Sequence, residues 1–276
     1  MRDKLPWCTA LAAATLAAEV LMRLAGKVAV VTGAGSGMGR ATALLFAHEG
    51  AAVVGSDIDA GRLEAVTAEA VAAGGRMIGV AGNIAERESA ESLVRRAIDE
   101  FGQLDVLVNN AGIMDRMEGV ANFSDETYQR VFGVNVYGPF VASRAAVRHM
   151  KERGKGAIVN VASVAGVSGA AAGAVYTASK HALVGLSRNT AYAYAPFGIR
   201  CNVLIVGGVE TNIMAGADPA TFDHEALAQY GKWHAVNPRT LQPDEVASLT
   251  LFLASDEASG INGAAVPIDG GWTAAG

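Results

Sequence analysis

Cysteine, proline and charged residues are all scarce in this 276-residue chain. The two cysteines, Cys8 and Cys201, lie far apart and in no spacing typical of metal ligands or redox pairs, so neither a disulfide framework nor a metal site is expected. A formal net charge of −5 provides no basic surface for nucleic acid. These absences favour a protein of the reducing cytoplasm, with no nucleic-acid or membrane partner.

A long apolar run is missing as well. The stretch Leu5–Val20 is too short for a comfortable transmembrane helix and contains Glu19. Three interpretations of the first residues stay open: a signal peptide, a short helix on the surface, and a start upstream of the natural one at Met22. We therefore treat residues 1–23 as an N-terminal extension and residues 24–276 as the folded domain.

Apolar residues (51%) and glycine (33 residues) are abundant. Short apolar segments alternate with segments of helical periodicity, which predicts a single α/β domain with a doubly wound parallel sheet, a Rossmann fold of about seven strands flanked by helices. The expected strands are Val28–Val31, Ala52–Val54, Met77–Val80, Val106–Val108, Ile158–Val161, Val203–Val206 and Ala264–Ile268. The expected helices are about Gly37–Glu49, Gly61–Ala73, Arg87–Phe101, Asp125–Lys151, Val175–Ala195 and Asp244–Ala254. Residues 207–243 contain no clear strand and are expected to form a lid over the substrate.

A glycine-rich turn follows the first expected strand and reads Thr32-Gly33-Ala34-Gly35-Ser36-Gly37-Met38-Gly39. Glycine lets the backbone approach a pyrophosphate, and the N–H groups at the start of the next helix supply donors. A purely structural tight turn is the alternative. The pattern Thr-Gly-x-x-x-Gly-x-Gly resembles the cofactor loop of the short-chain dehydrogenase/reductase family, and the resemblance extends from about Leu24 to Trp272.

A second pattern, Tyr176-Thr177-Ala178-Ser179-Lys180, is similar to the family's Tyr-x-x-x-Lys. Four residues on a helix place both side chains on one face, where a lysine ammonium can favour the phenolate of a tyrosine. The resemblance implies that Tyr176 is the acid/base, Lys180 its tuner, Ser163 the polariser of the substrate oxygen and Asn135 the anchor of a proton relay. Each residue alone could be a turn, cap or core residue, but four at matching positions favour catalysis.

Asp57 closes the second expected strand, 18 residues beyond Gly39. A carboxylate there accepts the ribose hydroxyls of NAD and repels the 2′-phosphate of NADP, and we expect no nearby arginine or lysine for that phosphate. A structural turn at Asp57 is the alternative. By resemblance, the residues that bind NAD are Gly33, Ser36, Gly37, Met38, Gly39, Asp57, Ile58, Asn83, Ile84, Asn110, Ala111, Gly112, Tyr176, Lys180, Gly207, Val209 and Thr211.

Two positions depart from the family pattern. Asn83 stands where an aspartate is usual, and Val206 replaces a proline that usually precedes Gly207. The residues expected to face the substrate are mostly small or apolar, and they are Ile113, Met114, Val167, Ala170 and Met214.

The sequence therefore predicts an NAD-dependent oxidoreductase that interconverts a secondary alcohol and a ketone, both small and apolar. Two alternatives stay open: a 3-oxoacyl-carrier-protein reductase, which commonly uses NADPH in this family, and a nucleotide-sensing binding protein on the same fold. The resemblance also implies a homotetramer, paired through the long helices around Asn135 and Tyr176.

Overall fold

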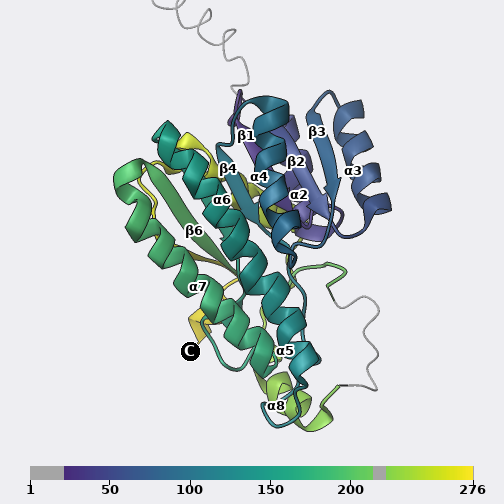
Figure 1. Ribbon diagram of the computed structural model, residues 1–276. Helices are drawn as coiled ribbons and strands as arrows, with labels where there is room; N and C mark the ends of the chain where they lie inside the picture. The colour runs from purple at the N-terminus through teal and green to yellow at the C-terminus, as the bar shows by residue number, and fades with distance from the viewer. Residues whose placement is uncertain (1–21, 214–221, 276) are drawn as a thin grey trace, which may run out of the picture.

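The computed structural model describes residues 22–213 and 222–275. Within these ranges, seven strands form one parallel sheet in the order β3-β2-β1-β4-β5-β6-β7 (Figure 1). The strands are β1 (Val28–Thr32), β2 (Ala52–Asp57), β3 (Arg76–Ala81), β4 (Val106–Asn109), β5 (Gly156–Val161), β6 (Ile199–Val206) and β7 (Ala265–Ile268). The predicted doubly wound α/β fold is confirmed.

Helices cover both faces of the sheet, which explains why its strands are apolar on both sides. On β1, Ala29 and Val31 pack into one buried cluster, whereas Val28 and Val30 pack into the other. The first cluster lies under α2 (Gly37–His48), α3 (Ala60–Ala72) and α9 (Pro243–Ala254), and the second under α4 (Arg87–Phe101) and α6 (Gly138–Arg153). Beside α6 runs α7 (Ala174–Tyr194), the helix that carries the Tyr-x-x-x-Lys pattern (Figure 1).

One predicted helix is interrupted. The sequence predicted a continuous helix over Asp125–Lys151, but the chain forms α5 (Asp125–Phe132), a π-helical turn η1 (Gly133–Tyr137) and then α6. Pro139 provides the physical reason, because it has no N–H to donate to the carbonyl of Asn135, four residues earlier. The wider turn of a π-helix is common at functional sites, and here it holds Asn135.

The expected lid contains a helix that the sequence pattern did not reveal. Residues 207–243 include α8 (His224–His234) and an isolated bridge between Val209 and Leu241. Residues 214–221, with Met214 among them, and residues 1–21 lie outside the described residues. The lid and the N-terminal extension therefore stay predictions.

The order of the strands locates the crevice where a ligand can bind. From β1 the chain builds outward through β2 and β3, then returns to the other side of β1 with β4. The loops after β1 and β4 leave the sheet in opposite directions at this switch point, and a crevice opens between them. Both the glycine-rich loop and Asn110 lie at this edge.

Candidate active site

The glycine-rich loop connects β1 tightly to α2. Gly33 has a φ of +68°, and a Cβ on Gly39 would lie only 2.0 Å from the carbonyl oxygen of Gly33, so neither position accepts a side chain without rearrangement. Ser36 is the N-cap residue of α2, yet its side chain makes no capping hydrogen bond. The side chain of Ser36 therefore does not occupy the first N–H groups of α2. An anion-binding site at a helix N-terminus requires such donors.

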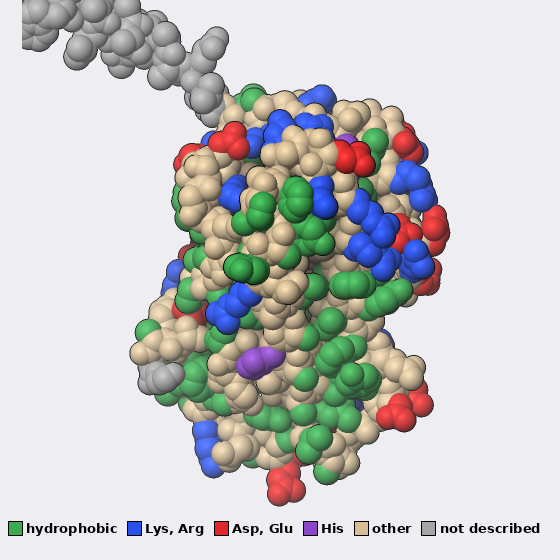
Figure 2. Space-filling model, turned by 60° about the vertical axis from the view of Figure 1, so that its left-hand side comes forward, with side chains coloured by type: hydrophobic (Ala, Val, Ile, Leu, Met, Phe, Trp, Pro, Cys, Tyr) green, Lys and Arg blue, Asp and Glu red, His purple; other side chains and the backbone are tan. Residues whose placement is uncertain are grey.

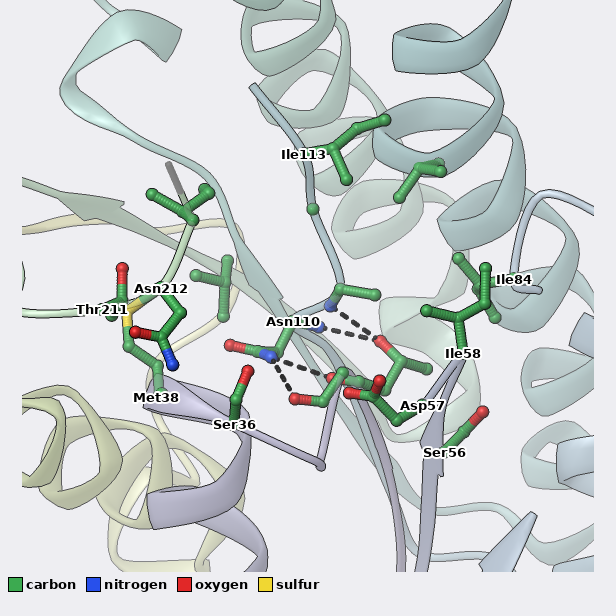
Figure 3. Close-up of a pocket in the computed structure, with 18 of the residues that line it drawn as sticks. Ser36, Met38, Ser56, Asp57, Ile58, Ile84, Asn110, Ile113, Thr211 and Asn212 are labelled. Carbon is green, nitrogen blue, oxygen red and sulfur yellow. Dashed lines mark hydrogen bonds between the residues drawn. The ribbon is translucent and has the colours of Figure 1, made fainter. Parts of the chain in front are cut away.

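The end of β4 is tied to the same loop. Asn110 donates from Nδ2 to the carbonyl oxygen of Thr32 at 2.9 Å, and the backbone N–H groups of Asn110 and Ala111 both donate to Oγ1 of Thr32 at 3.0 Å (Figure 3). These bonds hold the two loops of the switch point in a fixed relation, with the cavity between them.

Asp57 occupies one end of that cavity. Its carboxylate accepts the backbone N–H of Gly35 at 2.9 Å and that of Asp59 at 3.0 Å. Ile58 beside it is 71% exposed. The expectation that no cation lies near this end was wrong, because Arg62 lines the same cavity, where its guanidinium pairs with Asp59 at 3.0 Å. Arg62 lies in the first turn of α3, and from there it reaches back to the cavity. The sequence alone did not indicate this direction.

The cavity has a volume of about 390 Å³, within the range of small-molecule sites. The residues named from the sequence that line it are Gly33, Ser36, Gly37, Met38, Asp57, Ile58, Asn83, Ile84, Asn110, Ala111, Gly112, Tyr176, Lys180 and Thr211. Ile113, Asn212 and Ile213 line it as well.

Three residues expected to bind the cofactor lie beside the cavity rather than in its wall. Gly39 packs against Gly33, and Gly207 packs against Asp269, whose Cα would be 2.8 Å from a Cβ at that position. Val209 forms the bridge to Leu241. At the opposite wall, Asn83 accepts the backbone N–H of Ala85 at 3.0 Å through its amide oxygen.

Tyr176 and Lys180 lie together at the inner end of the cavity. Tyr176 is 6% exposed, and burial raises the pKa of its phenol to about 12, while a hydrogen bond with the Ser163 side chain acts in the opposite direction. Lys180 Nζ lies 5.4 Å from the centroid of the Tyr176 ring and donates to the carbonyl oxygen of Val161 at 3.0 Å. Burial lowers the pKa of Lys180 to about 8. Burial therefore favours the neutral form of both groups.

Asn135 lies close to Lys180 and binds the backbone of the loop that follows β4. Its amide accepts the backbone N–H of Ile113 at 2.9 Å and donates to the carbonyl oxygen of Ile113 at 3.0 Å. A Cβ on Gly112 would lie 3.3 Å from Lys180 Nζ and 3.5 Å from Asn135 Oδ1. The glycine leaves room for both side chains, so the structure brings all four residues of the expected catalytic set to one place.

Two further residues at this site were missed by the sequence analysis. Ser179 accepts a hydrogen bond from Asn135 Nδ2 at 3.1 Å, and Asp115 accepts the backbone N–H of Tyr176 at 2.8 Å. Ser179 stood inside the Tyr-x-x-x-Lys pattern and could have been considered. Asp115 carries no pattern of its own, since it comes from a loop 61 residues before Tyr176.

Tyr176 also belongs to an apolar cluster of buried and half-buried side chains. Its members include Met114, Met117, Leu227, Tyr230, Trp233 and Trp272. Of the residues expected to face the substrate, Ile113 lines the cavity and Met114 packs into this cluster, whereas Val167 is largely exposed.

None of the described helices combines the length and apolarity needed to span a bilayer. The described histidine, cysteine, aspartate and glutamate side chains form no group of three arranged to hold a metal ion.

Comparison with known proteins identifies the family. Residues 33–273 match a family model described as enoyl-(acyl carrier protein) reductase. The chain is 40% identical over 252 residues to 3beta-hydroxysteroid dehydrogenase 2 of Eggerthella lenta, covering 91% of this chain and 96% of that protein. It is also 40% identical over 258 residues to the short-chain dehydrogenase/reductase olcF of Penicillium canescens, covering 91% and 98%. The protein belongs to the short-chain dehydrogenase/reductase family and is an oxidoreductase of that family.

Solved structures agree with this assignment. Levodione reductase superposes with a TM-score of 0.84 at 33% identity, over 92% of this chain and all of the other. A presumed NAD(P)-dependent gluconate 5-dehydrogenase from Beutenbergia cavernae, with NADP bound at low occupancy, superposes with a TM-score of 0.81 at 37% identity, over 92% and 99%. A nicotinamide dinucleotide is the cofactor of the family.

Proposed function

We propose that this protein interconverts a secondary alcohol and a ketone with NAD, and that Tyr176 moves the hydroxyl proton. The observation that carries the proposal is that Tyr176 and Lys180 line the same cavity as Asp57, with Ser163 beside Tyr176 and Asn135 beside Lys180. When bound, the dinucleotide exchanges a hydride with the carbinol carbon. The residues of this chain supply the proton transfer, the orientation and the dry surroundings.

The proposed roles follow from the contacts. The Tyr176 phenol donates its proton to the substrate oxygen during reduction and accepts it during oxidation. Ser163, whose hydroxyl acts to lower the pKa of the Tyr176 phenol, polarises the same oxygen. The Lys180 ammonium stabilises the phenolate, and Asn135 holds Ile113 and faces Lys180 across Gly112, where it can anchor a water that relays the proton.

The cofactor end of the cavity supports NAD. The uncapped start of α2 suits the pyrophosphate, and the Asp57 carboxylate, oriented by two backbone N–H groups, suits the ribose hydroxyls. We infer that Ile58 and Ile84 flank the adenine and that Asn83 contacts its amino group. Two observations favour NADP instead: Arg62 lines the cavity, and a structural neighbour has NADP bound. A direct measurement of cofactor preference decides between NAD and NADP.

The substrate that we propose is a largely apolar ring compound. The apolar cluster around Tyr176 can bury such a molecule but offers few polar partners. The names of two relatives, a hydroxysteroid dehydrogenase and levodione reductase, support the same class. A cytoplasmic location and a homotetramer complete the proposal.

A second candidate function is reduction of an acyl group held by a carrier protein, which the description of the matching family model favours. The sequence contains a basic group suited to an acidic carrier, Arg148, Lys151, Arg153 and Lys155. Arg153, however, is committed to Gln103 and Asp105, and Lys151 lies over the Phe197 ring at 4.2 Å. Assays with free and carrier-bound ketones separate the two functions.

The test of the proposed function is Tyr176→Phe, assayed by NADH absorbance against a panel of cyclic alcohols and ketones. Turnover should fall by about 10²–10⁴-fold because the proton donor is lost, while NAD binding stays within about twofold. Tyr192→Phe is the matched control, since Tyr192 lies on the same helix but is 88% exposed. Turnover of the Tyr176 variant close to that of wild type would disprove the assignment, whereas a wild type that binds NAD but turns over none of the panel would favour a nucleotide-sensing protein.

A further inference from the structure

Asp115 is a buried carboxylate for which the reaction as proposed has no use. It is 4% exposed and lies in the loop between β4 and α5. One carboxylate oxygen accepts the backbone N–H of Met117 at 2.9 Å, and the other accepts the backbone N–H of Tyr176 at 2.8 Å. The buried carboxylate thus binds the backbone of the residue that we assign as the acid/base.

Asp115 takes the place of a cap on α7. The N-cap residue of that helix is Gly173, which has no side chain to offer. A Cβ on Gly173 would lie 2.5 Å from both carboxylate oxygens of Asp115, so the absence of a side chain is what admits the carboxylate. The N–H of Ala174 donates to the carbonyl oxygen of Glu118 at 3.0 Å, from the same loop. The first turn of α7 is therefore held by a distant loop and not by its own sequence.

The same loop is fixed at its other end by the cofactor cavity. Asn135 binds both backbone groups of Ile113, two residues before Asp115. Between these anchors, Met117 is buried with a φ of +58°, a conformation that non-glycine residues avoid unless their surroundings impose it. The carboxylate that binds Tyr176 also binds the N–H of Met117, so one side chain sets both the loop and the catalytic helix.

We propose that Asp115 is a positioning residue of the active site, which fixes Tyr176 at the wall of the cofactor cavity by holding the first turn of α7. The inference rests on the proposed role of Tyr176. Geometry carries it, and the electrostatics agree: the charge of Asp115 raises the pKa of Tyr176, while burial raises the pKa of Asp115 itself.

Other charged and titratable groups face this region from each neighbouring element. They are Arg116 and Glu118 in the loop, Arg130 on α5, Lys180 on α7, Asp223 before α8 and Tyr230 on α8. Asp115 is the carboxylate among them whose charge acts on the Tyr176 phenol. Glu118 has a carboxylate oxygen that is buried without a hydrogen bond, and it belongs to the same loop, so it provides a matched control.

The experiment measures the pH profile of kcat for alcohol oxidation in the full-length protein, for wild type, Asp115→Asn, Asp115→Glu and Glu118→Gln. Removing the charge stabilises the phenolate, so the limb that reports Tyr176 should move to lower pH by roughly half to one unit in Asp115→Asn. The limb should stay in place in Asp115→Glu, which keeps the charge, and in Glu118→Gln. The maximal kcat should fall about tenfold in both Asp115 variants, because the hold on Tyr176 is altered in each.

A purely structural carboxylate would lower the thermal stability and scale kcat uniformly without moving the limb. An unmoved limb in Asp115→Asn would therefore overturn the inference, as would an equal shift in Glu118→Gln. Asp115→Ser, a smaller neutral acceptor, replaces the Asn variant if that protein does not fold, and the same shift is expected. Tyr176→Phe in the same assay separates the two hypotheses. If it retains turnover, the proposed function fails. If it is inactive while the limb of Asp115→Asn stays in place, only the inference about Asp115 fails.

Discussion

The active-site residues show how burial and charge act against each other on single side chains. Burial raises the pKa of Tyr176 to about 12 and lowers that of Lys180 to about 8, so each group resists the charge that catalysis gives it. Ser163 counteracts the effect on Tyr176 through a hydrogen bond, whereas Asp115 reinforces it. The proton affinity of the phenol is thus set by burial and by two neighbours, Ser163 and Asp115, of which the sequence pattern identified Ser163.

We also expect a single residue, Asp57, to control cofactor preference. A 2′-phosphate would place a second anion beside Asp57, and unit charges about 4 Å apart repel by roughly 4 kcal/mol at an effective dielectric constant near 20. Because solvent and movement reduce that value, we expect wild type to favour NAD over NADP by about a hundredfold in kcat/KM. Asp57→Ser with Ile58→Arg should remove the repulsion, supply a partner for the phosphate and shift the preference toward NADP.

The measurement is kcat/KM for both cofactors in wild type, in the double variant and in Arg62→Ala. Arg62 is the control because it lines the same end of the cavity but already pairs with Asp59. Its loss should leave the use of NAD unchanged. A wild type that uses NADP as well as NAD would show that Asp57 does not discriminate.

At the scale of elements, periodicity predicted the sheet well because the central strands β1, β2, β4, β5 and β6 are almost entirely buried and therefore mostly apolar. It failed where local chemistry overrides periodicity. Gly133, Gly138 and Pro139 interrupt the apolar pattern of the helix around Asn135, and they were the available signal for the π-helical turn. It also failed for α8, whose apolar residues Leu227, Tyr230 and Trp233 recur every three residues but are only half-buried.

The catalytic residues could be predicted because Tyr176, Lys180 and Ser163 stand at fixed spacings in the sequence, on α7 and just after β5. The contacts that support these residues could not be predicted. Asp115 and Arg62 act through the loops and turns that bring them back to the cavity, and such contacts depend on the path of the chain in three dimensions.

The docking of α8 gives a prediction at the same scale. Trp272, 3% exposed near the C-terminus, stacks on Trp233 with ring centroids 5.8 Å apart and donates from Nε1 to its carbonyl oxygen at 3.2 Å. The edge of the His234 ring meets Trp272, and His234 also contacts the carbonyl oxygen of Ala171 at 2.8 Å. Trp272 therefore anchors the C-terminal end of α8.

Trp272→Ala should lower the free energy of unfolding by about 3–5 kcal/mol and raise KM for the substrate about tenfold, with the Kd for NAD nearly unchanged. Trp272→Phe keeps an aromatic ring for stacking but loses the Nε1 donor, so its effects should be much smaller. Steady-state kinetics and chemical denaturation measure both quantities. A destabilised Ala variant with an unaltered KM would mean that the tryptophan supports the core but not the lid.

For the whole molecule, the question is what covers the apolar side chains that one chain leaves exposed. With the α7 side turned forward, Figure 2 shows hydrophobic side chains gathered on the lower half of the surface. Tyr128 on α5, Tyr137 on η1 and Phe140 on α6 are each more than 40% exposed, although they are large and apolar. Helices that carry such residues next to the active site suit a self-complementary, two-fold contact with the same helices of another copy.

We therefore expect a homotetramer in solution, paired through these helices. Phe140, 43% exposed, should lie in that contact, and Phe140→Glu should dissociate it because a carboxylate would be buried without a partner. Val71→Glu is the control, since Val71 is 53% exposed on α3, which covers the other face of the sheet. Sedimentation velocity at micromolar concentration should give a tetramer for wild type and the control, and smaller species for Phe140→Glu.

Because η1 and α7 also position Asn135 and Tyr176, dissociation should reduce kcat as well. A wild type that sediments only as a monomer would refute the assembly and leave the exposed aromatic residues without an explanation.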